Sequence, residues 1–169
     1  MKNTKRTVIS ALLVSLSLAL FAIELLIPPF PFCPAAKIGL ANIVTLYMLS
    51  CRNNFKICDV FLVLISRCIL SALITGRLMS VAFSLSGGIA AILIMILVRN
   101  ILSEKNIVAM SISGAVFHNL SQIIVAVCIY GTFSAFYYIP SLFIAGVVCG
   151  ILTGVCVKLI VKANIINKI

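Results

Sequence analysis

The sequence predicts an all-α, polytopic membrane protein with six transmembrane helices in one bundle and both termini in the cytoplasm. Hydrophobic residues make up 63% of the 169 residues and charged residues only 9%, against about 25% charged residues in a typical soluble domain. The mean hydropathy is +1.30, and the apolar residues fall into runs that suit the roughly 30 Å hydrocarbon core of a bilayer. We therefore expect residues 1–169 to form a single transmembrane domain, without a soluble catalytic domain.

Six apolar runs are separated by short connections, and each run is expected to form one span. The predicted spans cover residues 8–28, 37–51, 57–75, 78–98, 107–130 and 137–161. At a rise of 1.5 Å per residue most of these runs cross the hydrocarbon core, whereas the second is short unless its entry is also embedded. Only Gly76 and Arg77 separate the third span from the fourth, so these two spans are expected to form a tight antiparallel hairpin.

The first span follows a basic start, MKNTKR, which is similar to the beginning of a signal peptide. The apolar run after it is about 20 residues long and has no clear small-residue cleavage site. We therefore expect this segment to remain in the protein as its first span.

The loop after the first span, PPFPFCPAAK, contains four of the five prolines in the chain. Proline fixes φ and removes a hydrogen-bond donor, so this loop is expected to be stiff and extended. It is either a simple connector or a rigid cap over a pocket on the outer side.

The net charge of +10 is explained by the orientation of the chain. If the N-terminus is cytoplasmic, ten cations lie in the inner segments and two in the outer loops. The inner set is Lys2, Lys5, Arg6, Arg52, Lys56, Arg99, Lys105, Lys158, Lys162 and Lys168, and the outer pair is Lys37 and Arg77. Lysine and arginine are enriched on the cytoplasmic side of membrane proteins. The charge therefore predicts that both termini are inside, and it does not indicate a nucleic-acid partner.

The chain is not expected to hold a metal ion or cofactor or to carry out catalysis. Enzymes that act on diphosphates through magnesium need clustered carboxylates. The three acidic residues, Glu24, Asp59 and Glu104, are far apart in the sequence, and there is no phosphate-binding GxxxxGK[ST] loop. The seven cysteines form no CxxC pair, so we interpret them as small buried hydrophobic residues.

Polar residues recur at a similar depth in the predicted spans, in the half of the membrane nearer the outer side. They are Glu24, Asn42, Arg67, Ser84, Ser86, His118, Asn119 and Gln122. His118 and Gln122 are four residues apart and Asn119 and Gln122 three, so this spacing predicts one shared helix face. Facing lipid would leave donors and acceptors unsatisfied at a few kcal/mol each, so the face is expected to point into the bundle.

Two interpretations of these polar residues are open. Hydrogen bonds between transmembrane helices, worth about 0.6–2 kcal/mol each, are the simpler one. A ligand site is the other, and we favour it because Arg67 lies at the same depth as the histidine cluster.

Arg67 lies near the middle of the third span, where an arginine costs roughly 2.5–3.5 kcal/mol and usually faces a partner or a watery cavity. Glu24 is the acidic residue at a compatible depth, so an ion pair between Glu24 and Arg67 is one possibility. The other is that Arg67, with Lys37 and Arg77 at the rim, forms an outward-facing cationic pocket for an anionic group.

Two predicted spans carry small residues at a spacing of four. The first set is Ala11, Ser15 and Ala19, and the second is Gly146, Gly150 and Gly154. Small residues in this register allow another helix to approach closely. We expect the glycines to pack within the chain, whereas the set on the first span either packs within the chain or docks a partner.

Several segments resemble a family of bacterial membrane proteins over nearly the entire chain. These segments are IELLIPPFPF, KIGLANIVTLYML, SLSGGIAAILIMI, SGAVFHNLSQIIVA and YYIPSLFIAGVVCGILTGV. The family is usually labelled heptaprenyl diphosphate synthase component I, or Gx transporter family. In size, six-span plan and cytoplasmic termini it is similar to the substrate-binding S components of energy-coupling-factor (ECF) transporters.

The resemblance to S components implies a ligand site beneath the loop of residues 28–37. Its residues would be Asn42, Arg67, Ser84, His118, Asn119 and Gln122. It also implies that the small residues of the first span dock a transmembrane coupling subunit, which acts with ATP-binding subunits in the bacterial cell membrane. The expected function is to capture a small polar or anionic metabolite, such as a vitamin, a flavin or a quinone or prenyl precursor, from the outer side.

Two other functions are open from the sequence. One is a stand-alone proton-coupled carrier in which Glu24 and His118 titrate. The other is a membrane subunit that supports prenyl diphosphate or quinone synthesis without catalysis of its own. Binding of ATPases, uptake driven by a pH gradient, or stable association with a soluble prenyl synthase would distinguish the three.

Overall fold

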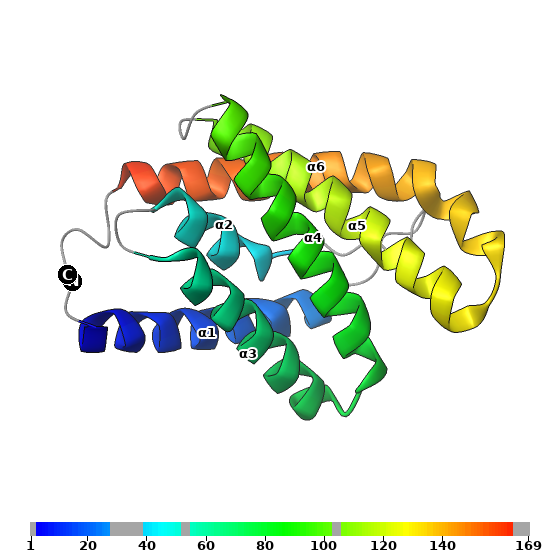
Figure 1. Cartoon of the computed structure of the whole chain (residues 1–169), viewed down its shortest axis with the longest axis horizontal. Helices are drawn as coiled ribbons and strands as arrows, with labels where there is room; N and C mark the ends of the chain where they lie inside the picture. The colour runs from blue at the N-terminus through cyan, green and yellow to red at the C-terminus, as the bar shows by residue number, and fades with distance from the viewer. Residues whose placement is uncertain (1–2, 28–38, 52–54, 103–105, 164–169) are drawn as a thin grey trace.

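The computed structural model describes residues 3–27, 39–51, 55–102 and 106–163, and the regular structure in this part of the chain is helical throughout (Figure 1). The elements are α1 Asn3–Leu26, α2 Asn42–Ser50, α3 Ile57–Thr75, α4 Met79–Leu102, α5 Ile107–Tyr130, the 3-10 helix η1 Phe133–Tyr138 and α6 Ile139–Lys162. Within the described residues, five helices are long and apolar enough to cross a membrane. The predicted fold class, an all-α multi-pass membrane protein, is confirmed.

α2 is shorter still than the second span expected for residues 37–51, which was already short for a bilayer crossing. Its nine residues rise about 14 Å, roughly half of a bilayer's hydrocarbon core. The helix begins late because the chain turns at Gly39, whose φ of +74° suits glycine. Residues 44–49 are all buried, and α2 contacts every other α-helix. This short apolar helix is therefore enclosed by the bundle (Figure 1).

Two buried arginines contact the two ends of α2. Arg67 of α3 donates from both terminal nitrogens to Oδ1 of Asn42, at the first residue of α2, over 3.4 Å. Arg99 of α4 donates from Nη1 to the carbonyl oxygen of Leu49, in the last turn of α2, over 3.2 Å. A cation is favourable at the C-terminal, negative end of a helix, so Arg99 stabilises that end of α2.

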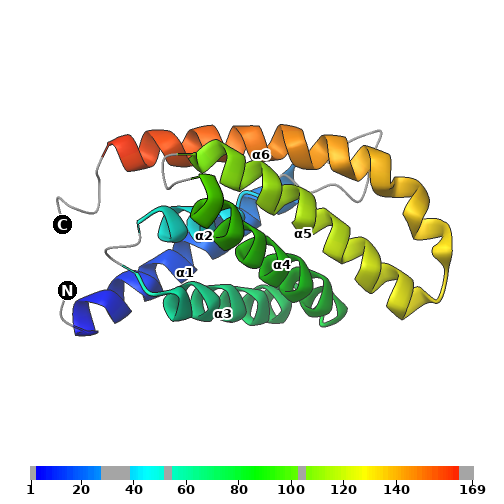
Figure 2. The same ribbon diagram turned by 45° about the horizontal axis from the view of Figure 1, so that its top comes forward.

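The two ends of the bundle differ in charge. The start of α1 and the end of α6 lie at the same end of the bundle, which we call the basic end (Figure 2). Its cations are Lys5, Arg6, Lys56, Arg99, Lys158 and Lys162. At this end Asp59 of α3 contacts Nε of Arg6 on α1 at 3.2 Å and accepts a hydrogen bond from the backbone nitrogen of Lys56 at 2.8 Å. Asp59 thus joins α1 to α3.

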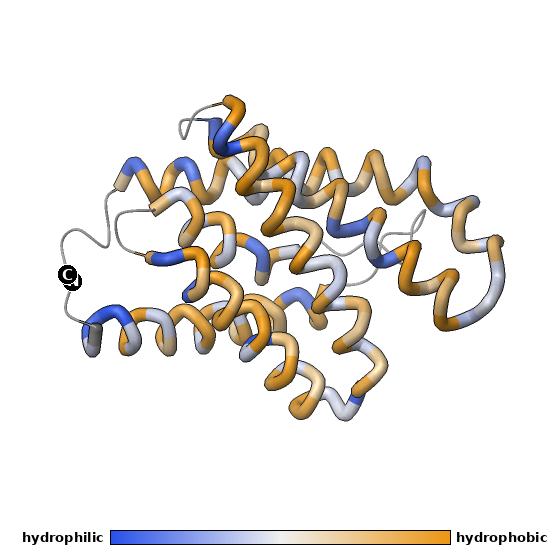
Figure 3. The backbone as a smooth tube through the Cα atoms, viewed as in Figure 1, coloured by the Kyte–Doolittle hydropathy of each residue, from blue (hydrophilic) through white to orange (hydrophobic). Residues whose placement is uncertain are grey.

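Hydrophobic residues dominate the lengths of the helices between their ends (Figure 3). Hydrophilic residues are concentrated at the basic end and, within the bundle, at the start of α2 and in the middle of α5 (Figure 3). The opposite end is less charged, and Arg77, in the short α3–α4 connection, is its cation among the described residues. The fold therefore places a group of polar side chains among apolar helices.

α5 and α6 approach each other through small residues. The glycines of α6 that face α5 are Gly146, Gly150 and Gly154. A Cβ atom at position 150 would lie only 2.6 Å from Cα of Ile112, so no side chain fits between the two backbones. Oγ of Ser111 and Oγ1 of Thr153 join the same two helices with a hydrogen bond of 2.8 Å.

Candidate functional site

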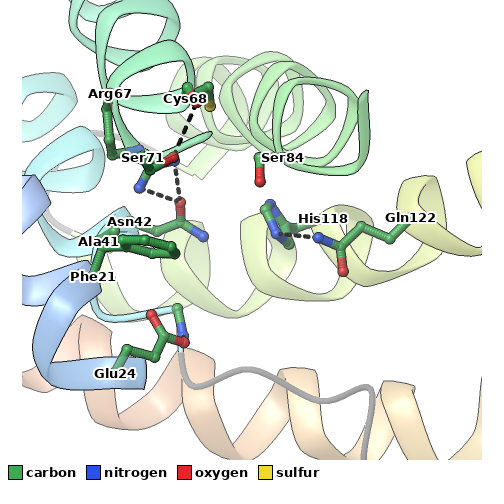
Figure 4. A pocket seen from close by; sticks show the side chains of 11 residues that line it. Phe21, Glu24, Ala41, Asn42, Arg67, Cys68, Ser71, Ser84, His118 and Gln122 are labelled. Carbon is green, nitrogen blue, oxygen red and sulfur yellow. Dashed lines mark hydrogen bonds between the residues drawn. The ribbon is translucent and has the colours of Figure 1, made fainter. Parts of the chain in front are cut away.

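A cavity of about 50 Å³ lies where α1, α2, α3, α4 and α5 converge (Figure 4). We call it the polar cavity. It is lined by Phe21, Glu24, Gly39, Ala41, Asn42, Arg67, Cys68, Ser71, Ser84, His118 and Gln122. Six residues expected from the sequence to bind a ligand are therefore brought together here, from five different helices. The volume is enough for a few water molecules and smaller than most pockets for drug-sized ligands, which measure about 300–1,000 Å³.

Arg67 supplies the positive charge of the polar cavity. Its side chain is only 7% exposed, and the 3.4 Å contacts from both terminal nitrogens to Asn42 Oδ1 are longer than the usual 2.7–3.2 Å. Among the described residues, no carboxylate lies within salt-bridge distance of Arg67. The cavity therefore contains a buried cation that contacts a neutral amide oxygen, while the carboxylate of Glu24 lines the same cavity without forming a salt bridge to it.

Glu24, near the end of α1, lies on the other side of Asn42 from Arg67 (Figure 4). Its Oε1 accepts a hydrogen bond of 2.6 Å from the backbone nitrogen of Gly39. The direct ion pair between Glu24 and Arg67, one of the two possibilities from the sequence, is not formed. Instead the carboxylate holds the turn that precedes α2 and so positions Asn42.

His118 and Gln122 form the α5 wall of the polar cavity. Nε2 of His118 lies 3.1 Å from Nε2 of Gln122, which is one helical turn further along and on the far side of the ring from Arg67 (Figure 4). The ring lies against Gly87 of α4: a Cβ atom there would be 2.7 Å from Cε1 of His118. The glycine therefore provides the space that the imidazole occupies, and Ser84, three residues earlier on α4, lines the cavity beside it.

A second, smaller cavity of about 30 Å³ continues between α5 and α6. It is lined by Gly39, Asn42, Ser111, Ala115, His118, Asn119, Gly146, Cys149 and Thr153. Nδ2 of Asn119 donates a hydrogen bond of 2.9 Å to the carbonyl oxygen of Leu142. The polar face predicted for α5 is thus divided: His118 and Gln122 line the polar cavity, whereas Asn119 joins α5 to α6.

A comparison with protein families shows the family of this chain. The family described as heptaprenyl diphosphate synthase component I matches residues 13–160. The chain belongs to this family. Comparisons with curated proteins and with solved structures give no match. The description "component I" implies a system with more than one component, of which this membrane protein is one.

Ser86 and Arg77, which were also predicted to belong to the ligand site of this component I protein, lie apart from both cavities. Ser86 is half-buried, and its Oγ donates to the carbonyl oxygen of Phe83 at 3.2 Å. Arg77 is exposed in the α3–α4 connection. Lys37 and the expected cap of residues 28–37 lie outside the described residues.

The small-residue set on α1 is exposed. Ala11, Ser15 and Ala19 all lie on the surface of the bundle, and Oγ of Ser15 donates to the carbonyl oxygen of Ala11 at 3.2 Å. α1 contacts α3 and α2 with its other side. In this component I chain the set therefore faces outward, toward lipid or another subunit.

The described acidic residues lie at different ends of the bundle. Glu24 lines the polar cavity and Asp59 lies at the basic end, while Glu104 is outside the described residues. In the part of the chain that the structure describes, no group of three or more His, Cys, Asp or Glu residues is placed to hold a metal ion.

Sequence reasoning missed five residues that line the polar cavity. They are Phe21, Gly39, Ala41, Cys68 and Ser71. Helical spacing could have identified two of them, because Ser71 follows Arg67 by four residues and Phe21 precedes Glu24 by three. Gly39 and Ala41 reach the cavity only because α2 starts so late, which the sequence did not indicate.

Proposed function

We propose that this component I protein is the substrate-binding membrane subunit of a transporter, comparable in role to an ECF S component, and that it captures a small polar or anionic metabolite in the polar cavity. The observation that carries the proposal is the environment of Arg67. A guanidinium group has five N–H donors, and here it is buried beside one neutral amide oxygen at 3.4 Å. An anionic group of the substrate would supply a counter-charge in direct contact with Arg67, a contact that Glu24, in the same cavity, does not make.

The start of α2 supports the same proposal. The N-terminal end of a helix carries partial positive charge, and α2 begins at Asn42, in the wall of the polar cavity. Broken helices in transporters direct such ends at anionic groups of their substrates. Irregular backbone at membrane depth is also tolerated where it lines a cavity, as the turn at Gly39 does.

The orientation and the partners complete the proposal. With the basic end in the cytoplasm, the termini would be inside the bacterial cell membrane and the polar cavity would lie toward the outer side. The exposed set of Ala11, Ser15 and Ala19 would then dock a transmembrane coupling subunit that acts with ATP-binding subunits. The protein itself would bind the metabolite, and the partners would supply the energy.

The family description favours a second candidate function. A membrane subunit of a prenyl diphosphate synthase system, without catalysis of its own, would fit the family description. Diphosphate chemistry through magnesium needs clustered carboxylates, and the described acidic residues are separated. This candidate predicts a soluble synthase as the stable partner.

The test of metabolite binding uses Arg67→Met. Native mass spectrometry of the protein, incubated with a soluble metabolite extract, is expected to detect a bound small molecule in the unsubstituted protein and a loss of about tenfold or more in Arg67→Met. Arg77→Met removes an exposed arginine that lines neither cavity and is expected to retain the molecule. If no bound molecule depends on Arg67 in a variant that keeps its helical circular dichroism, the proposed site is wrong.

Purification of the protein in mild detergent, followed by identification of the proteins that remain bound, distinguishes the two candidate functions. ATP-binding subunits that are lost in the double substitution Ala11→Leu, Ser15→Leu would support the transporter subunit. A soluble prenyl synthase as the sole stable partner would support the synthase subunit and contradict the first proposal. Uptake driven by a pH gradient, without ATP or any partner, would contradict both.

A further inference from the structure

A larger space adjoins the polar cavity on the far side of His118 from Arg67. This apolar groove has a volume of about 400 Å³. Its walls include Phe83 of α4, Ile123, Ala126 and Tyr130 of α5, Tyr138 of η1 and Leu142 of α6. The volume lies within the range of about 300–1,000 Å³ found for small-molecule sites, whereas the polar cavity has room for only a few atoms.

The apolar groove and the polar cavity share a wall. Gln122 lines both of them. On α4 the consecutive residues Phe83 and Ser84 line the groove and the cavity, respectively. The side chain of Gln122, which lies 3.1 Å from His118, therefore stands at the boundary between a polar space that contains both Arg67 and Glu24 and an apolar one.

Exposed aromatic side chains lie next in the sequence to residues that line the groove at Thr132, Ser134 and Tyr138. Phe133 and Tyr137 of η1 are 76% and 88% exposed, and the ring of Phe133 stacks on that of Phe136 with centroids 6.1 Å apart. Tyrosine, as at position 137, is enriched at membrane–water interfaces. Amphiphilic molecules also concentrate at this interface, so the groove opens where such molecules are available.

We propose that the ligand is a single-chain amphiphile, with a small anionic head beside Arg67 in the polar cavity and an apolar portion in the apolar groove. This inference rests on the proposed function, because it names the substrate class of the same site. Charge complementarity places the head, since Arg67 has no carboxylate within salt-bridge distance in the described part of the chain. The small volume of the polar cavity excludes a bulky head such as that of a two-chain phospholipid.

The experiment uses a decanoate probe that carries a diazirine at its apolar end, with the full chain in lipid nanodiscs. Illumination is expected to crosslink the probe to α5 and η1 residues of the groove, located by peptide mass spectrometry. Labelling is expected to fall about tenfold or more in Arg67→Met and with the matching diazirine decanol, which lacks the charge. Two results would overturn the inference: equal labelling by the decanoate and decanol probes, or equal labelling of the unsubstituted protein and Arg67→Met. In either case the groove would bind acyl chains whatever the charge of the head.

A second variant tests the groove while Arg67 is kept. Ala126→Phe places a ring in the groove and is expected to reduce labelling by the decanoate probe about tenfold, whereas Ile124→Phe, at an exposed position of the same helix outside the groove, is expected to label like the unsubstituted protein. Unchanged labelling in Ala126→Phe would place the apolar portion elsewhere and overturn the inference.

A short anion separates this inference from the proposed function. The sequence contains one histidine, so ¹³C-labelled histidine gives a single NMR signal from His118. One outcome would overturn the amphiphile but support the anion site. In it, acetate shifts the His118 signal only when Arg67 is present, while labelling of the groove is the same with and without Arg67. If neither acetate nor decanoate depends on Arg67, both proposals fail.

Discussion

Gly87→Ala is expected to weaken the proposed binding of a metabolite about tenfold or more while the bundle stays folded. The new Cβ atom would lie 2.7 Å from Cε1, 2.8 Å from Nδ1 and 3.0 Å from Nε2 of His118, closer than carbon and ring atoms can approach. The ring must therefore leave its position, and the 3.1 Å contact with Gln122 is lost with it. Ligand titration by native mass spectrometry measures the affinity, and the single histidine NMR signal reports the displacement of the ring.

The adjacent glycine provides the control. A Cβ atom at position 88 would meet the side chain of Leu64 in the hydrophobic core, so Gly88→Ala is expected to lower the free energy of unfolding by about 1–3 kcal/mol with little change in the histidine signal. If both variants move the histidine signal equally, or if Gly87→Ala leaves it in place, the described contact between α4 and the ring is wrong.

Gly150→Ala is expected to destabilise the protein by about 1–3 kcal/mol, or more if the helices cannot adjust. The added methyl group would lie 2.6 Å from Cα of Ile112. A backbone atom cannot rotate away as a side chain can, so α6 must shift relative to α5. Such a shift also strains the 2.8 Å hydrogen bond between Ser111 and Thr153. Reversible unfolding in detergent, followed by circular dichroism, measures the loss.

The neighbouring glycine on the same face gives an internal comparison. A Cβ atom at position 146 would have its nearest neighbours at 3.2 Å, Nδ2 of Asn119 and Cα of Val116, so Gly146→Ala is expected to be milder than Gly150→Ala. If Gly146→Ala is the more destabilising of the two, α5 and α6 do not approach as closely at Gly150 as the structure describes.

The long helices could be predicted from the sequence because each depends on one continuous apolar run. The turn between α3 and α4, at Gly76 with a φ of +68°, was also readable, since glycine readily adopts that conformation. The residue at which α2 begins could not be predicted. Residues 37–51 are apolar enough for a longer helix, and the late start depends on the turn at Gly39 and its bond to Glu24, a contact between segments far apart in the sequence.

The sequence predicted which residues meet in the polar cavity, but not which hydrogen bonds they form. Similar depth in antiparallel helices was enough to group Arg67 with His118. The partner of Glu24 is a backbone N–H, which residue types cannot indicate. His118 and Asn119 were placed on one face, yet consecutive residues in an α-helix are about 100° apart. Asn119 therefore points to α6 while His118 lines the polar cavity, and this separation could have been derived from helix geometry.

The enclosed position of α2 has a consequence for the order in which the protein folds. A helix of nine residues is too short to be stable alone, and its apolar side chains are covered by the other five α-helices together. Long spans can form independently in the bilayer and associate afterwards, whereas α2 gains its stabilisation only when they do. The polar cavity, whose wall includes the first residue of α2, is therefore expected to be completed only after the long spans have associated. A substitution that slows this step is expected to disrupt the polar cavity before it prevents membrane insertion.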